Sequence, residues 1–178
     1  MELKYTDITV HTKLDEKTFR RFARFDMFAL RKKWVRPAVF SLIMIAFAVI
    51  ALLARKEQSG MIAAVLLAVG IGLPLVYIGT FLSQVNVQAA RAKLKPARPV
   101  YTVTLRDEGI RIVNDQKEEE PQEADWQSIQ QAFRKKDCVY LYVTAQKAFL
   151  LPAKQADAPD KEVWEFIREH LGAEKCKG

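Results

Sequence analysis

Cysteine and histidine are scarce in this sequence, and their spacing excludes most chemistry that depends on them. The chain has two of each: Cys138 and Cys176, and His11 and His170. The sequence contains no CxxC pair and no Cys/His spacing typical of a metal site, and isolated thiols stay reduced in a cytoplasmic protein. A glycine-rich phosphate loop, a GxSxG elbow and an HExxH helix are also absent from the sequence. We therefore predict that the protein is not an enzyme and has no metal and no cofactor.

Charge is absent from two long stretches, and these organise the rest of the chain. Residues 37–54 and 61–82 contain no Lys, Arg, Asp or Glu, whereas residues 55–60 between them read Arg-Lys-Glu-Gln-Ser-Gly. At about 1.5 Å per residue the first run spans roughly 27 Å as a helix, close to a bilayer core of about 30 Å, and the second is longer. Two buried core helices are the alternative, but a chain of 178 residues leaves too little protein to cover them. The pattern therefore predicts a transmembrane helical hairpin with an external turn at 55–60.

Basic residues gather on both flanks of this hairpin. Residues 1–36 hold ten Lys or Arg and residues 83–100 hold four with no acid, against two in the turn. The positive-inside rule then predicts that both termini are cytoplasmic. Bases beside a membrane are general determinants of topology, and they are also candidate contacts for lipid headgroups: Arg31, Lys32, Lys33, Arg36, Lys93, Lys95 and Arg98.

The formal charge of +7 is therefore a membrane signal rather than a nucleic-acid signal. Residues 101–178 carry 12 bases against 15 acids, so the cytoplasmic segment after the hairpin is net acidic. A folded segment of this kind has no basic face for phosphates. We expect membrane lipids as partners and no nucleic acid.

The N-terminal segment, residues 1–36, predicts a strand followed by a helix. Residues 2–10 are rich in β-branched and aromatic residues, and Asp15 is a candidate N-cap with Leu14 and Phe19 as a hydrophobic staple. The helix then has a phenylalanine at every third position from Phe19 to Phe28, with arginines between them. These rings either lie in the headgroup layer or pack on the C-terminal domain, and both can hold.

Small residues recur every four positions in the second apolar run, at Ala64, Ala68 and Gly72. Such a stripe lets another helix approach closely. The stripe predicts either homodimerisation or packing of the hairpin on itself, and we favour the second. The matching small residues of the first run are Ala46, Ala51 and Ala54.

Beyond the hairpin, residues 83–99 predict a helical extension that ends before Pro96 and Pro99. Residues 100–172 then predict a β-rich domain with one closing helix, followed by a tail at 173–178. The acidic stretch 115–125 predicts a solvated loop or an exposed strand. The expected strands and helix are 100–105, 110–113, 126–133, 138–144, 147–151 and the helix 159–171. If the N-terminal strand joins this domain, the hairpin is an insertion into it, which is the arrangement we prefer.

Short motifs along most of the chain carry a resemblance to a known family: Leu14-Asp15-Glu16 with Phe19 and Phe22, Tyr101 to Leu105, Glu108-Gly109-Ile110, Trp126 to Ile129, Asp137 to Tyr142, and Leu150 to Lys154. In these the sequence resembles the YcxB-like proteins, bacterial membrane proteins with two spans and a cytoplasmic C-terminal domain. The resemblance implies a membrane α-helical hairpin plus a cytoplasmic α+β domain, in which a bent antiparallel PH-like β-barrel of about seven strands is capped by a C-terminal helix. It brings no catalytic residue.

The function expected from these features is a membrane-anchored interaction module in the bacterial cytoplasmic membrane. Its PH-like domain binds a protein, a peptide or a lipid headgroup, and the candidate contact residues on the domain are Lys135 and Lys136. The alternative is a structural subunit of a membrane complex, assembled as a homo-oligomer or with another protein through the hairpin.

Overall fold

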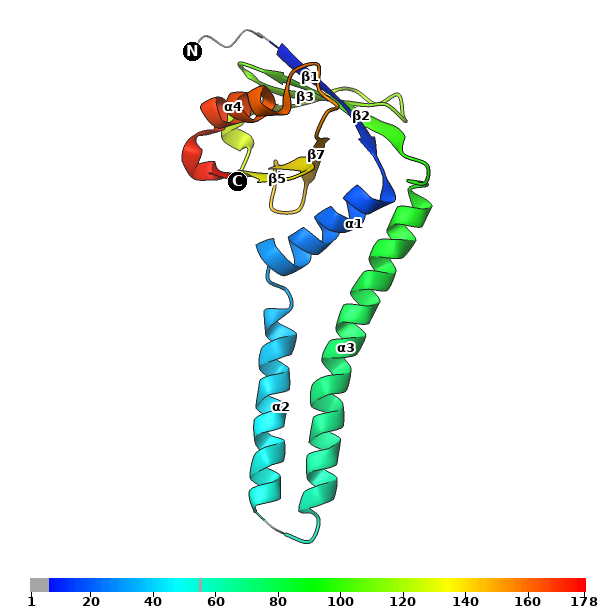
Figure 1. Cartoon of the computed structure of the whole chain (residues 1–178), viewed down its shortest axis with the longest axis vertical. Coiled ribbons are helices and arrows are strands. Elements are labelled where there is room, and N and C mark those ends of the chain that lie inside the picture. Colours follow the sequence, from blue (N-terminus) through cyan, green and yellow to red (C-terminus); the bar gives the residue numbers. More distant parts are fainter. Residues whose placement is uncertain (1–6, 55) are drawn as a thin grey trace. The chain divides into compact units, whose positions relative to one another are not determined.

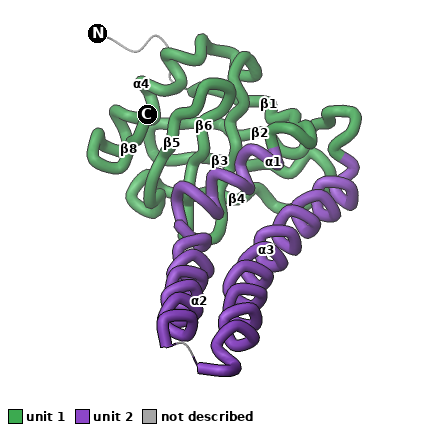
Figure 2. Tube along the Cα trace, turned by 60° about the horizontal axis from the view of Figure 1, so that its bottom comes forward, with its two compact units in different colours: residues 1–18, 94–178 green, residues 19–93 purple. Residues whose placement is uncertain are grey.

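The computed structural model describes residues 7–54 and 56–178, which fall into two compact units (Figures 1 and 2). The sheet domain contains the described residues up to Thr18 together with Leu94–Gly178, and the helical unit contains Phe19–Lys93. The helical unit is thus inserted into the sheet domain between Thr18 and Leu94. This answers the question that the sequence left open about the N-terminal strand.

Four helical segments lead into and form the helical unit: α1 (Glu16–Arg24), the π-helical turn η1 (Phe25–Leu30), α2 (Val35–Leu53) and α3 (Ser59–Arg91). α1 begins as the sequence predicts, because the Asp15 carboxylate accepts a hydrogen bond from the Thr18 N–H at 2.8 Å. Hydrogen bonds from Thr18 also hold the pKa of Asp15 below its usual value. α3 ends before Pro96, as expected from the prolines beyond it.

α2 and α3 confirm the prediction of two long apolar helices. They contain 19 and 33 residues, and their most apolar windows have mean hydropathies of 2.3 and 2.5. Both are therefore long and apolar enough to span a membrane. Phe28 of η1 packs edge-on against Phe81 of α3, with ring centroids 6.2 Å apart. At least one of the regularly spaced phenylalanines thus packs within the helical unit, an arrangement that the sequence did not suggest.

The sheet domain contains two four-stranded sheets, with strand orders β1-β2-β3-β4 and β7-β6-β5-β8. Its elements are β1 (Asp7–Leu14), β2 (Arg98–Arg106), β3 (Gly109–Asn114), β4 (Gln122–Asp125), the 3-10 turn η2 (Trp126–Ser128), β5 (Gln131–Lys135), β6 (Cys138–Tyr142), β7 (Ala148–Pro152), α4 (Asp160–Leu171), the 3-10 turn η3 (Ala173–Lys175) and β8 (Cys176–Lys177). The predicted strand at 2–10 is observed as β1 from Asp7, and residues 2–6 lie outside the described part.

β1 joins the domain by antiparallel pairing with β2, from Asp7 opposite Arg106 to Leu14 opposite Arg98. β1 also touches the segment after β7, because Val10 and Ala156 form an isolated bridge. The N–H of His11 donates to the carbonyl oxygen of Gln155 at 3.0 Å. The first sheet therefore meets the second along β1, a strand that precedes the helical unit in the chain.

The domain core lies between the two sheets and α4. Side chains with little or no exposure come from both sheets, as with Ile8, Leu105 and Leu141, and from the inner face of α4, as with Phe166 and Ile167. Alternating burial along β1 and the apolar stripe of α4 produce this arrangement directly. The predicted order of strands followed by one long helix is confirmed for β2 to β7 and α4, and the short elements η3 and β8 come after that helix.

Three expectations for this domain need correction. The described strands form two separate sheets rather than one closed barrel, because β4 is followed by η2, and β5 pairs with β6 and β8 instead of β4. The predicted strand at 126–133 begins only at Gln131, since the Trp126 indole N–H donates to the Arg106 carbonyl oxygen at 2.8 Å and holds residues 126–128 in a turn. The expected tail, 173–178, contains η3 and β8, and β8 runs parallel to β5 with Cys176 opposite Ala132.

Candidate interaction site

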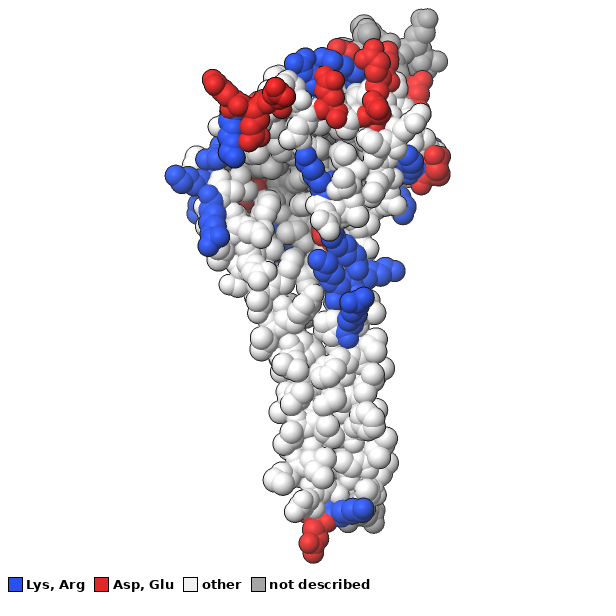
Figure 3. All heavy atoms as spheres, turned by 180° about the vertical axis from the view of Figure 1, so that it is seen from behind, with Lys and Arg blue, Asp and Glu red and all other residues white. Residues whose placement is uncertain are grey.

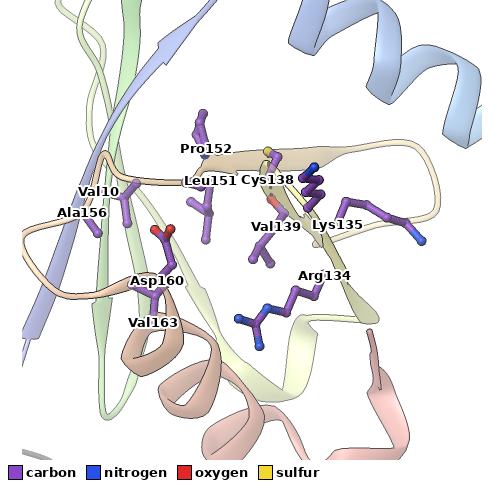
Figure 4. A pocket seen from close by; sticks show the side chains of 12 residues that line it. Val10, Arg134, Lys135, Cys138, Val139, Leu151, Pro152, Ala156, Asp160 and Val163 are labelled. Carbon is purple, nitrogen blue, oxygen red and sulfur yellow. Dashed lines mark hydrogen bonds between the residues drawn. The ribbon is translucent and has the colours of Figure 1, made fainter.

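The two lysines singled out by the sequence border a pocket of the sheet domain, called here the β5–β6 pocket. It has a volume of about 80 Å³ and is walled by the β5–β6 hairpin, the end of β7, the loop that follows it, the first turn of α4, and β1. Lys135 ends β5, and Lys136 begins the two-residue turn to β6. The side chains that line the pocket are shown in Figure 4.

The floor of the pocket is apolar. Val10, Cys138, Val139, Leu151 and Val163 line it, and all five are buried. One water needs about 10–15 Å³ of such space, so the pocket has room for more than a single water molecule. An apolar floor in a pocket of this size suits an apolar side chain from a partner.

The rim of the pocket is mainly cationic. Arg134, Lys135 and Lys136 border it, and a single carboxylate, Asp160, lies on the α4 side. The Arg134 guanidinium lies over the Trp164 ring, 5.9 Å from its centroid, which orients this charge beside the pocket. The rim therefore favours a ligand with more negative than positive charge.

Backbone hydrogen bonds fix the loops around the rim. The N–H of Ala153 donates to the carbonyl oxygen of Asp137 at 2.9 Å, which ties the β5–β6 turn to the end of β7. The Asp160 carboxylate accepts the Lys154 N–H at 2.7 Å, so one of its oxygens is engaged in holding the loop before α4. The pocket is therefore bounded by backbone segments that are tied to one another.

Cys138 lies in the pocket but is poorly suited to covalent chemistry. Burial raises the pKa of its thiol to about 12, so the thiol is protonated at neutral pH. Its Sγ lies 3.5 Å from the carbonyl oxygen of Val139. The pocket therefore offers shape and charge for binding.

Comparisons with protein-family models, curated proteins and solved structures found no match to this chain.

The structure separates the seven bases named as candidate lipid contacts. Arg31 is engaged with Asp26, its Nε lying 2.7 Å from a carboxylate oxygen, and Arg98 lies in β2, where it donates to the Gln116 side chain at 2.6 Å. Lys33 and Arg36 border one hollow between α2 and α3. The other three, Lys32, Lys93 and Lys95, are exposed. Figure 3 shows Lys and Arg gathered beside the uncharged helical surface, at the end away from the turn.

The small-residue stripe does not face α2, which corrects the packing that we favoured. Ala64 and Ala68 are exposed, and a Cβ added to Gly72 would meet nothing within 4 Å. α2 and α3 instead meet where Ser41 and Met44 face Gly70, with the Ser41 hydroxyl donating to the Gly70 carbonyl oxygen at 2.6 Å. The suggested partners Ala46 and Ala54 are exposed as well, whereas Ala48 is buried.

Sequence reasoning missed three residues that matter at these sites: Arg134, Asp160 and Ser41. Arg134 directly precedes the two lysines in the sequence, so it could have been identified with them as part of one basic stretch. Ser41 is the one polar residue of its apolar run, and hydroxyl groups in such runs commonly bond to a neighbouring helix. Asp160 had no comparable signal, because an acid in the first turn of a helix is common.

Proposed function

We propose that the protein is a membrane-anchored interaction module, in which the α2–α3 hairpin spans a membrane and the sheet domain binds a segment of another protein. The β5–β6 pocket carries this proposal, because it joins a cationic rim to an apolar floor. Such a pocket fits an apolar anchor side chain flanked by acidic residues. By the positive-inside rule the sheet domain and both termini lie in the cytoplasm.

Exposed apolar surface supports the membrane anchor. Among the described residues, every large apolar side chain that is exposed lies between Trp34 and Val87. Only 6% of the most apolar window of α2 and 11% of that of α3 is buried. Soluble proteins rarely expose apolar patches of such extent, and a core helix would be mostly buried.

Membership of the YcxB-like family, and with it a bacterial origin, is part of this proposal. Its support is the order of the elements: an apolar hairpin precedes β2, the strands β2 to β7 follow it, and α4 comes after them.

Charge reversal at the pocket tests the proposed interaction in the full-length chain. The Lys135→Glu/Lys136→Glu variant should recover on the order of tenfold less of a bound partner than the wild type, because its rim repels acidic residues. The measurement is affinity capture from native membranes with quantitative mass spectrometry. The captured protein should then crosslink through an acidic segment to a photoreactive group at position 136.

The matched control is Lys117→Glu/Lys161→Glu. It changes the net charge equally, and both side chains are more than two-thirds exposed and paired on the surface with Glu119 and Glu165. The control should retain the partner. Equal recovery with the wild type, the pocket variant and the control would refute the pocket as the binding surface.

A structural subunit remains the second candidate, and the exposed stripe favours it. Since Ala64, Ala68 and Gly72 are not used against α2, they are available to a helix of another chain. The Gly72→Leu variant should then dissociate an oligomer in native gels while leaving the partner of the β5–β6 pocket bound. An unchanged oligomeric state in this variant would rule out assembly through the stripe.

A further inference from the structure

The hollow between α2 and α3, called here the Tyr77 hollow, brings basic and apolar residues together in one concave site. The positive-inside rule alone requires bases on the flank of a span and does not require such a site. The hollow has a volume of about 460 Å³, within the usual range of small-molecule sites, about 300–1,000 Å³. Two bases, Lys33 and Arg36, lie at one end of the residues that line it, and Phe40, Leu73 and Pro74 supply apolar surface.

Two aromatic residues mark the level of the hollow along the helices. Tyr77 lines it and is 42% exposed, and Trp34, just before α2, is 44% exposed. Tyr and Trp concentrate at the headgroup level of membrane proteins. The Ser41–Gly70 hydrogen bond aligns the antiparallel helices so that the start of α2 lies beside residues 73–77 of α3. The end of the hollow that carries Lys33 and Arg36 therefore lies at the headgroup level of the proposed span, on the side of the basic flanks, whereas Phe40 and Leu73 lie within the two apolar runs.

The two bases of the hollow also differ from Arg31. The Arg31 charge is matched by Asp26, whereas no carboxylate of residues 7–54 and 56–178 forms an ion pair with Lys33 or Arg36. Both side chains are exposed. Their charge is thus available to a ligand, and the charge that complements it is negative.

We propose that the Tyr77 hollow binds one anionic phospholipid, with its phosphate at Lys33 and Arg36 and an acyl chain against Phe40 and Leu73. Tyr77 lies at the same level and donates its hydroxyl hydrogen to the headgroup. Basic pockets between helices on the cytoplasmic side of a membrane are a recurrent way of holding such lipids. This inference rests on the membrane anchoring proposed above, and it concerns a site separate from the β5–β6 pocket.

The test uses the full-length chain in nanodiscs of phosphatidylcholine and phosphatidylglycerol in equal amounts, with identical acyl chains. Native mass spectrometry after gentle detergent extraction should show one phosphatidylglycerol retained in preference to phosphatidylcholine. The Lys33→Gln/Arg36→Gln variant should retain about thirtyfold less, the loss expected when two cations no longer attract an anionic headgroup. The Leu73→Trp variant should also retain less of the lipid, because the bulkier indole competes with the acyl chain for the surface beside Phe40 without changing any charge.

The matched control is Lys93→Gln/Lys95→Gln, which removes two exposed bases that do not line the hollow. It should retain the lipid as the wild type does. Equal loss in the two double variants, equal retention of both lipids, or no retained lipid in the wild type would overturn the proposed site.

Flotation of the wild-type protein with vesicles in sodium carbonate separates this inference from the anchoring on which it rests. A protein that floats but retains no lipid refutes the Tyr77 hollow alone. A protein that does not float refutes the membrane anchor, and the lipid site is refuted with it.

Discussion

The sheet domain buries its large apolar side chains, whereas the helical unit leaves many of them exposed. In the sheet domain, the large apolar side chains of both sheets and of α4 are turned into one core, and Phe166 and Ile167 show no exposure. In the helical unit, Leu42 is 68% exposed and Leu75 is 64% exposed. The sheet domain buries its own large apolar side chains. The exposed apolar side chains of α2 and α3 can be shielded from water only by something outside the chain.

The sheet domain and the helical unit also use side-chain hydrogen bonds for different purposes. In the sheet domain, the Trp126 indole N–H donates to the Arg106 carbonyl oxygen. The Tyr101 hydroxyl donates to the carbonyl oxygen of Leu150 and accepts from its N–H. Burial raises the pKa of Tyr101, so this hydroxyl keeps its proton. In the helical unit, the Ser41 hydroxyl bonds across to the other helix. Polar groups thus fix loops and sheets in the domain, and they fix the alignment of two helices in the hairpin.

The largest expected effect comes from truncating the domain core. Phe166→Ala should lower the free energy of unfolding by about 3–5 kcal/mol, because it removes a fully buried ring. That ring packs 4.3 Å from the His170 ring and 6.2 Å from the Trp126 ring. Urea unfolding of the full chain in mild detergent, followed by tryptophan fluorescence, measures the loss. Faster maleimide labelling of the buried Cys138 should accompany it.

The control for this prediction is Leu75→Ala, which truncates a comparable side chain on the exposed surface of α3. We expect almost no change in the same measurement. A loss as large as that of Phe166→Ala would show that the surface of α3 is packed against protein, and the comparison between the two units would no longer hold.

Much of this architecture could be predicted because it depends on local patterns. The two apolar runs, the N-cap at Asp15 and the apolar stripe of α4 each follow from residues close together in the sequence. The 3-10 turn at Trp126 could not be predicted, since it depends on a bond to Arg106, 20 positions away. The two-residue strand β8 carries no pattern of its own and is defined only by its pairing with β5.

A charged residue on the exposed surface of α2 gives the next largest effect. Phe47→Lys, near the middle of the predicted span of 37–54 and 54% exposed, should disfavour membrane insertion by about 2.5–3.5 kcal/mol, because a cation in the bilayer centre loses its hydration. Glycosylation mapping of the turn between α2 and α3 measures the inserted fraction. On a surface that faces water, the same substitution would be nearly neutral.

The control for this prediction is Val87→Lys, measured by the same glycosylation mapping. Val87 is 45% exposed and lies in the part of α3 beyond the predicted span of 61–82. It should insert like the wild type. Normal insertion of Phe47→Lys would contradict the membrane-spanning hairpin.

Less of the candidate sites than of the fold could be predicted. Lys135 and Lys136 were identified from a basic turn, but the walls of the β5–β6 pocket come from segments as distant as Val10 and Val163. The helix-packing face was misassigned for a different reason: α3 has small residues on more than one face, at Ala63 and Gly70 as well as Ala64 and Ala68. Only the position of α2 decides which of these faces is the interface.

The smallest effect contrasts two glycines of the same helix. An added methyl group at Gly70 would lie 2.7 Å from the Met44 Cβ, whereas at Gly72 it would meet nothing within 4 Å. Gly70→Ala should therefore weaken the pairing of α2 with α3 by about 1–3 kcal/mol through overpacking. Gly72→Ala should leave the pairing intact and gain up to about 1 kcal/mol from helix propensity. Titration of mixed micelles with sodium dodecyl sulfate, followed by circular dichroism, measures both. The reverse order of stability would place the α2 contact on the stripe of Ala64, Ala68 and Gly72, and would remove the exposed face that the assembly alternative requires.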